Sequence, residues 1–140
     1  MWTYNGTMYD PSQEDLQIYI GFVYLLTEVD TDMKYIGKKF FWKKVTKPPL
    51  KGRKNKRRSL VESDWKTYYG SNDKIKALVE SGLADKFDRQ ILRLCETKGE
   101  CSYYEAKYQF DNSVLLRDDY YNGIISCRIN QSHVRGIKDV

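Results

Sequence analysis

The chain has 140 residues, which suits a single domain with a buried core. Its net charge of +5 is unevenly distributed: from Lys38 to Arg58 there are eleven basic and no acidic residues, and elsewhere 13 basic against 19 acidic. A local positive field of this kind indicates a polyanionic partner, DNA or RNA rather than a membrane. No apolar run reaches membrane-spanning length and the N-terminus is not signal-like, so we expect no membrane association.

The cysteines and the single histidine exclude several kinds of site. Cys95, Cys101 and Cys127 are odd in number and lack metal-ligand spacing, so we expect reduced thiols and a cytoplasmic location. His133 is the only histidine. A classical zinc site and a histidine-based catalytic triad are therefore excluded.

The N-terminal third of the chain predicts an arm followed by a β-hairpin. Residues 1–15 are polar and rich in turn formers, which predicts a loose N-terminal arm. Residues 18–28 (IYIGFVYLLTE) are apolar and aromatic and predict a central strand. The turn formers at 29–32 precede an alternating run at 33–38, so the two segments predict a hairpin.

The basic segment and the residues after it predict a loop and two helices. Prolines and a glycine interrupt residues 38–58, which predicts a long loop. A capping-box pattern opens a predicted helix over 59–70. Ser71 is the predicted cap of a second helix, which Gly82 ends.

The last part of the chain completes an α+β domain. Residues 87–96 fit a helix or a strand, and their length and β-compatible side chains favour a strand. A second capping-box pattern predicts a third helix over 102–112, and 124–129 predict a short strand. We therefore expect a small, mainly antiparallel sheet flanked by about three helices, with the domain at 16–130 and a C-terminal tail at 131–140.

Two triplets on the predicted hairpin carry a resemblance to a known family. Phe-Val-Tyr at 22–24 and Tyr-Ile-Gly at 35–37 resemble the signature of the GIY-YIG nucleases. The later order of a basic stretch, two helices, a strand and a helix with an early glutamate follows the same plan over residues 18–130. The runs at 35–44 (YIGKKFFWKK) and 63–72 (SDWKTYYGSN) and the basic segment look most like the small phage enzymes grouped with Seg-type free-standing homing endonucleases.

The resemblance implies metal-dependent hydrolysis of DNA phosphodiesters. The expected cofactor is Mg²⁺, for which Mn²⁺ can substitute, and a phage-encoded enzyme would act in the cytoplasm of the bacterial host. The expected substrate is double-stranded DNA, and the protein is expected to be a monomer or a transient dimer. Two alternatives stay open, a nucleic-acid-binding module without catalysis and a small RNA-binding protein.

The resemblance also assigns roles to four residues. Tyr24 is the expected general base, Tyr35 orients water or phosphate, and Glu105 is the single metal ligand. Asn122 holds neighbouring groups by hydrogen bonds. The plainer alternatives are strand tyrosines that pack the sheet, a helix-capping glutamate and an Asn-Gly turn. Lesser candidates are Glu100 and Asp111 for the metal and Asn130 for the asparagine.

The source of positive charge at the site departs from the family pattern. The family carries a catalytic arginine on the helix after the second triplet, and residues 59–70 contain none. The nearest matches are Arg57 and Arg58, with Arg53 and the Lys38/Lys39 pair behind them. A tyrosine has an ordinary pKa of about 10, so a base at position 24 needs a neighbouring cation or a metal-bound water to favour its ionised form.

The basic segment is the expected DNA clamp, because neutralising several phosphates gives strong, salt-dependent binding. The alternative is a solvated basic loop whose aromatic residues, Phe40, Phe41 and Trp42, fill the core beneath it. The residues expected to contact DNA are Lys38, Lys39, Lys43, Lys44, Lys51, Arg53, Lys54 and Lys56.

Overall fold

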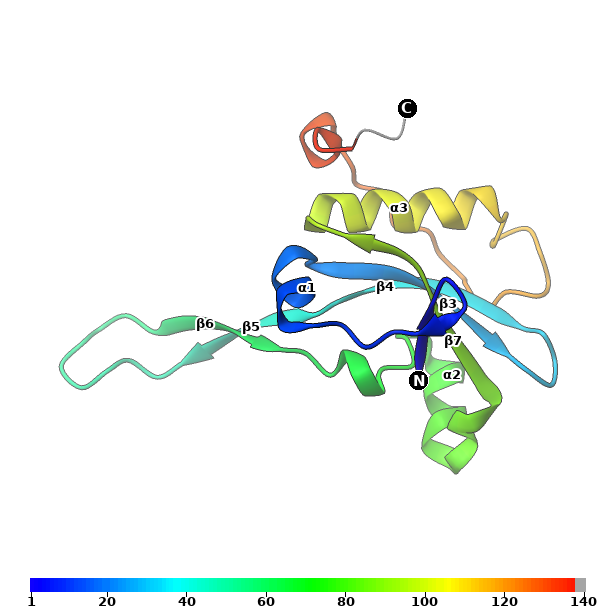
Figure 1. Ribbon diagram of the computed structural model, residues 1–140, viewed down its shortest axis with the longest axis horizontal. Helices are drawn as coiled ribbons and strands as arrows, with labels where there is room; N and C mark the ends of the chain where they lie inside the picture. Colours follow the sequence, from blue (N-terminus) through cyan, green and yellow to red (C-terminus); the bar gives the residue numbers. More distant parts are fainter. Residues whose placement is uncertain (138–140) are drawn as a thin grey trace.

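The computed structural model describes residues 1–137 and folds them around two sheets (Figure 1). The larger sheet has the strands β1 (Trp2–Tyr4), β2 (Thr7–Met8), β3 (Gly21–Glu28), β4 (Lys34–Phe40) and β7 (Phe87–Cys95). Their order is β2-β1-β7-β3-β4, and only the β1/β7 pair is parallel. The smaller sheet is the hairpin of β5 (Trp42–Lys47) and β6 (Arg57–Glu62).

Three α-helices pack around the larger sheet in the described part of the chain. They are α1 (Gln13–Ile18), α2 (Asp73–Leu78) and α3 (Lys98–Asp111), with a π turn at Val79–Leu83 and 3-10 turns at Trp65–Thr67, Ala84–Lys86 and Gln131–Val134. In Figure 1 α3 lies along one face of the sheet and α2 lies on the other. The predicted α+β fold with a mainly antiparallel sheet is therefore confirmed. None of the helices within residues 1–137 has the length and apolarity that a membrane span requires.

The predicted hairpin of β3 and β4 is confirmed, and its register decides which side chains share a face. Tyr24 is opposite Gly37, and Leu26 is opposite Tyr35. Because paired residues share a face and neighbours alternate, the side chains of Tyr24 and Tyr35 lie on one face together with Gly37. Ile36 faces the other side and packs in the cluster under α3.

The N-terminal residues form part of the domain, so the expectation of a loose arm is wrong. Trp2 is 2% exposed and donates its indole N–H to the carbonyl oxygen of Trp65 at 2.7 Å. β1 pairs in parallel with β7, with Trp2 opposite Arg89. This pairing and the burial of a large aromatic side chain hold the start of the chain in the sheet.

The basic segment is a β-hairpin, so the prediction of a long loop over 38–58 is wrong. β4 extends to Phe40, and β5 and β6 then pair in register from Trp42 opposite Glu62 to Lys47 opposite Arg57. Pro48, Pro49 and Gly52 form the connection between the strands, where neither the missing proline N–H nor a positive φ disturbs a ladder. Figure 1 shows this hairpin projecting from the body of the domain.

Two capping-box predictions are wrong because the residues have other partners. Ser59 lies in β6 opposite Val45, so no helix spans 59–70 and only a 3-10 turn follows. The third helix starts at Lys98, and its cap is Thr97, whose hydroxyl accepts the N–H of Glu100 at 3.1 Å. Ser102 is thus inside the helix.

The remaining predictions for local structure are partly right. The strand predicted at 87–96 is present as β7. The second helix has Asn72 as its cap in place of Ser71, and Gly82 leaves the helical region with a φ of 85°. Within residues 1–137, the stretch 124–129 forms no strand.

The C-terminal turn packs on the start of α3. A Cβ added to Gly99 would lie 2.7 Å from the Cβ of His133, so glycine permits this close contact. The last part of the predicted tail, 138–140, lies outside the described residues. Of the predicted domain boundaries, 16–130, the first is replaced by the start of β1 at Trp2, and the second stays a prediction.

Candidate active site

The two signature tyrosines meet above Gly37. The side chain of Tyr24 is 1% exposed, and its ring centroid is 6.3 Å from that of Tyr35. A Cβ added to Gly37 would lie 2.5 Å from the Tyr24 hydroxyl oxygen and 3.0 Å from Cε1 of Tyr35. Gly70, with a φ of 90°, closes the other side, where an added Cβ would lie 3.2 Å from the same hydroxyl. The glycine of the second triplet therefore makes room for the tyrosine of the first.

We expect Gly37→Ala to destabilise the protein by about 1–3 kcal/mol, because the new methyl group would overlap the buried phenol of Tyr24. Urea-induced unfolding measures the change in free energy of unfolding. Gly123→Ala is the matched control, since an added Cβ there has no heavy atom within 4 Å, and its effect should stay within about 0.5 kcal/mol. Equal effects at the two positions would contradict the packing shown by the structure.

Hydroxyl groups surround the buried phenol. Tyr35 and Ser71 share a hydrogen bond of 3.1 Å, and the hydroxyl of Tyr68 interacts with those of Tyr24 and Ser71. Burial raises the pKa of Tyr24 well above 10, and Tyr68, Tyr35 and the carboxylate of Glu105 raise it further. In this state Tyr24 is a neutral phenol at pH 7.

Two side chains fill the free edge of β4 beside Gly37. Asn122 accepts the N–H of Ile36 at 3.0 Å and donates its amide to the carbonyl oxygen of Ile36 at 2.8 Å. The backbone N–H of Lys38 donates to the carboxylate of Glu105. These bonds occupy an edge that would otherwise be open to another strand. They also fix Asn122 and Glu105 on either side of the glycine.

Glu105 reaches this edge from the middle of α3. Since the helix begins at Lys98, Glu105 is not its capping residue. Burial raises the pKa of Glu105, and the charge and backbone N–H of Lys38 act in the opposite direction. The Glu105 charge is in turn among the causes that raise the pKa of Tyr24, so the carboxylate and the phenol interact across the β4 edge.

The donor atoms near Glu105 suit a hard cation that keeps most of its water. Within residues 1–137 no group of three or more His, Cys, Asp or Glu side chains could enclose a metal ion. Glu105 offers one partly buried carboxylate. Mg²⁺ is commonly bound by one or two protein carboxylates, while substrate phosphate and water complete its coordination shell. The residues present therefore fit the predicted metal. The lesser candidates Glu100 and Asp111 are at the start and the end of α3.

Two lysines of β4 supply positive charge on either side of the strand. Lys38 donates to the hydroxyl of Ser102 on α3 at 2.7 Å. Lys39 binds Asp64 at 2.7 Å, and its ammonium nitrogen lies 4.1 Å from the centre of the Tyr68 ring. Because neighbours alternate along a strand, Lys38 is on the Glu105 side and Lys39 on the tyrosine side.

The structure does not bring the two predicted arginines to the tyrosines. Arg57 and Arg58 are exposed on β6, and the Arg57 guanidinium donates to the carbonyl oxygen of Pro48 at 3.2 Å. The hairpin that carries them points away from the body of the domain (Figure 1). The other residues predicted to contact DNA lie on β5 (Lys43 and Lys44) and in the connection before β6 (Lys51, Arg53, Lys54 and Lys56). Phe41 is fully buried and fills the core, which is what the alternative interpretation expected of the aromatic residues beneath the basic segment.

Sequence reasoning missed several residues that shape the site. Tyr68 is beside Tyr24 and raises its pKa, and Gln109 donates to the carbonyl oxygen of Ile36 at 2.9 Å. Arg89, 5% exposed, donates to the carbonyl oxygens of Lys66 and Tyr68, both at 3.0 Å. No local signal distinguishes Arg89, because the same strand also contains Asp88, Gln90 and Arg93.

We expect Arg89→Met to destabilise the protein by about 1–3 kcal/mol, because two carbonyl oxygens in a packed segment lose their donor. Thermal or urea unfolding measures this loss. Arg128→Met removes an equal charge from an exposed position and should change stability by less than about 0.5 kcal/mol. An unchanged stability in the Arg89 variant would show that these bonds do not hold the segment before Gly70.

The fold and the site together define a protein class. An α+β domain that joins a two-tyrosine hairpin to a glutamate-bearing helix is the arrangement implied by the resemblance to the GIY-YIG nucleases. Residues 2–125 match the family model described as "Putative endonuclease segE, GIY-YIG domain", so the chain belongs to this GIY-YIG family. It is therefore a nuclease domain, and its substrate is a nucleic acid. Searches of curated proteins and of solved structures gave no match.

Proposed function

We propose that the protein is a metal-dependent DNA endonuclease that hydrolyses phosphodiester bonds at the β4 edge. The observation that carries this proposal is the position of two groups on either side of the β4 edge: the phenol of Tyr24 lies over Gly37, and Glu105 lies beside Lys38 close enough for its charge to raise the pKa of Tyr24. Hydrolysis of a phosphodiester needs a proton acceptor for water, a cation for the developing charge and a path for the leaving oxygen.

Each of these groups has a role in the proposed reaction. The ionised form of Tyr24, which is scarce at pH 7, takes the proton from the attacking water, and Tyr35, on the same face, orients that water or the phosphate. Glu105 would hold Mg²⁺, which supplies Lewis-acid stabilisation of the phosphate when bound. Lys38 offsets negative charge that develops on the phosphate, a role that the sequence suggested for Arg57 or Arg58. Asn122 keeps the backbone of β4 in place through its two bonds to Ile36.

Incubation of supercoiled plasmid with the purified protein tests this proposal. We expect nicked circles with Mg²⁺ or Mn²⁺ and none with a chelator. Because one active site cuts one strand, nicked circles should form before linear DNA unless the protein dimerises on its substrate. A wild-type protein that binds duplex DNA but never nicks it would support the non-catalytic binding module. Preference for RNA duplexes at matched salt would support the RNA-binding alternative.

The biological role is proposed from the family alone. A small Seg-type nuclease encoded by a bacteriophage would serve gene mobility or DNA degradation in the host cytoplasm. Sequence-specific cutting at one position of a phage genome would favour gene mobility. Cutting at many unrelated sites would favour degradation.

A further inference from the structure

The hairpin of β5 and β6, here called the basic ribbon (residues 42–62), stands away from the rest of the fold. Its six cross-strand pairs hold it together, and every residue from 47 to 58 is exposed. In Figure 1 it extends well beyond the larger sheet. Leu60, at 59% exposed, and Leu50, at 53%, add little to a core. The packing of the domain therefore does not explain why this hairpin is present.

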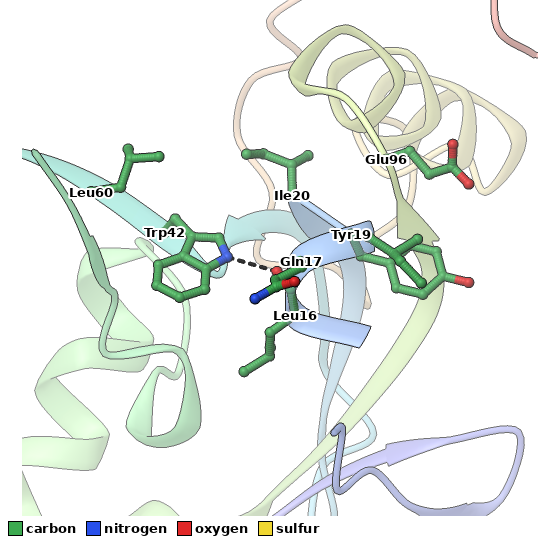
Figure 2. Close-up of a pocket in the computed structure, with 8 residues that line it drawn as sticks. Leu16, Gln17, Tyr19, Ile20, Trp42, Leu60 and Glu96 are labelled. Atoms are coloured by element: carbon green, nitrogen blue, oxygen red, sulfur yellow. Dashed lines mark hydrogen bonds between the residues drawn. The ribbon is translucent and has the colours of Figure 1, made fainter. Parts of the chain in front are cut away.

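The two faces of the basic ribbon can be told apart. Residues directly opposite each other share a face, so Trp42, Lys44, Leu60 and Arg58 lie on one side. Trp42 on this side donates its indole N–H to the carbonyl oxygen of Leu16 at 2.7 Å. Figure 2 shows this bond and the hollow of about 320 Å³ that Trp42 and Leu60 line together with the segment around α1.

The opposite face of the ribbon adjoins the active site. It carries Lys43, Lys47 and Arg57, and Lys47 is directly opposite Arg57. Lys43 and Lys39 line one shallow hollow at the base of the ribbon. Asp64 pairs with Lys39 at 2.7 Å, and the charge of Lys43 also lowers its pKa, so Lys43 lies beside the side of β4 that carries Lys39.

The dimensions of the basic ribbon suit the major groove of DNA. Two strands lie about 5 Å apart, and six residues at about 3.3 Å each reach about 20 Å. The major groove of B-DNA is about 12 Å wide and admits a two-stranded ribbon, whereas the minor groove is about 6 Å wide and takes one only when the duplex is deformed. In A-form RNA the major groove is deep and narrow, which excludes an insertion of this kind.

We propose that the basic ribbon enters the major groove of duplex DNA with the face of Lys43, Lys47 and Arg57 toward the base pairs. This inference rests on the proposed function, and it assigns to the ribbon the selection of the position that is cut. Arg57 and Lys47 have the donors to contact the O6 and N7 atoms of guanine. The basic residues of the connection, Lys51, Arg53, Lys54 and Lys56, contact phosphates.

Dimethyl sulfate footprinting tests the proposal, because the reagent methylates guanine N7 in the major groove and adenine N3 in the minor groove. The probe is a duplex selected from a random-sequence pool by binding to the wild-type protein without Mg²⁺. We expect guanine N7 atoms to be protected within about 6 base pairs to one side of the nick, which is about 20 Å at 3.4 Å per pair. Protection of adenine N3 alone would overturn the proposal.

Two double variants with equal loss of charge test the assigned face. K47Q/R57Q should restore methylation of the protected guanines and weaken binding about tenfold. K44Q/R58Q removes two charges from the other face and should reduce the slope of log K against log salt by about 2, with the guanines still protected. Identical footprints for the two variants would overturn the assigned face.

The two proposals fail in different ways. Nicking by the wild type without guanine protection would overturn the role of the basic ribbon and leave the nuclease proposal standing. Guanine protection without nicking would overturn the nuclease proposal and support the insertion of the ribbon in the groove.

Discussion

Tyr24→Phe should lower the rate of plasmid nicking by about a thousandfold while the fold stays intact. The substitution removes one hydroxyl from a side chain that is 1% exposed, so packing around Gly37 is nearly unchanged. A general base contributes between about 10² and 10⁴ to a rate, which sets the expected size of the loss. Single-turnover nicking at saturating protein measures the rate, and circular dichroism checks the fold. A rate within a few fold of the wild type would exclude Tyr24 as the base.

The pH dependence of the same reaction gives a second test of this role. Burial, Tyr68 and Tyr35 raise the pKa of Tyr24, so the ionised form is scarce at pH 7 and grows with pH. The nicking rate should therefore rise about tenfold per pH unit from pH 6.5 to 9, without a plateau. The residual rate of Tyr24→Phe should lack this slope. A wild-type rate that is flat above pH 7 would contradict proton loss from a buried phenol.

Tyr68→Phe separates a change in the pKa from a loss of the base. The interaction of the Tyr24 hydroxyl with that of Tyr68 is one of the causes that raise the pKa of Tyr24. Without it the rising limb of the pH profile should move to lower pH, because the phenolate of Tyr24 forms more readily. A loss of activity at every pH, with the slope unchanged, would instead give Tyr68 a direct role in the reaction.

Local patterns predicted the part of the site that lies on neighbouring strands. The alternation around Tyr35 and the turn before it were enough to place Tyr24, Tyr35 and Gly37 on one hairpin. The meeting of that hairpin with Glu105 and Asn122 depends on how α3 and the segment after it pack on the β4 edge. No local pattern contains that information, so only the resemblance indicated it.

The wrong predictions have identifiable physical causes. Pro48 and Pro49 suggested a loop because proline is excluded from the interior of a ladder, yet they lie in the connection between two strands. The strand β1 was not predicted because its partner, β7, is distant in sequence. Trp2 is opposite Arg89 in a parallel pairing, which no local pattern around Trp2 indicates. Ser59 and Ser102 both fit a capping-box pattern, but Ser59 lies in the strand β6 and Ser102 lies inside α3, which starts four residues earlier.

Glu105→Gln should abolish metal-dependent nicking and at the same time stabilise the metal-free protein at neutral pH. Loss of the single carboxylate removes the proposed metal ligand, so we expect a rate decrease of at least about a thousandfold. Burial raises the pKa of Glu105 in the folded state, so folding favours its neutral form. Well below the pKa that Glu105 has in the unfolded chain, its carboxyl group is protonated in both states, and its burial does not lower the free energy of unfolding. Above the higher pKa of the folded state, burial of the charged carboxylate lowers the free energy of unfolding by its full amount. The amide of Gln is neutral at all pH values and can still accept the N–H of Lys38.

Urea unfolding of the wild type and of Glu105→Gln in a chelator, at pH 4 and pH 7, measures this effect. The difference in free energy of unfolding should favour the variant at pH 7 and shrink toward zero at pH 4. Glu100→Gln, at the half-buried start of the same helix, is the matched control and should retain most of the nicking activity. With Mg²⁺ added, only proteins that keep Glu105 should gain stability, because a ligand stabilises the state that binds it. A Glu105→Gln variant that is less stable than the wild type at pH 7, or that still cuts DNA, would show that this carboxylate holds the fold together rather than a metal ion.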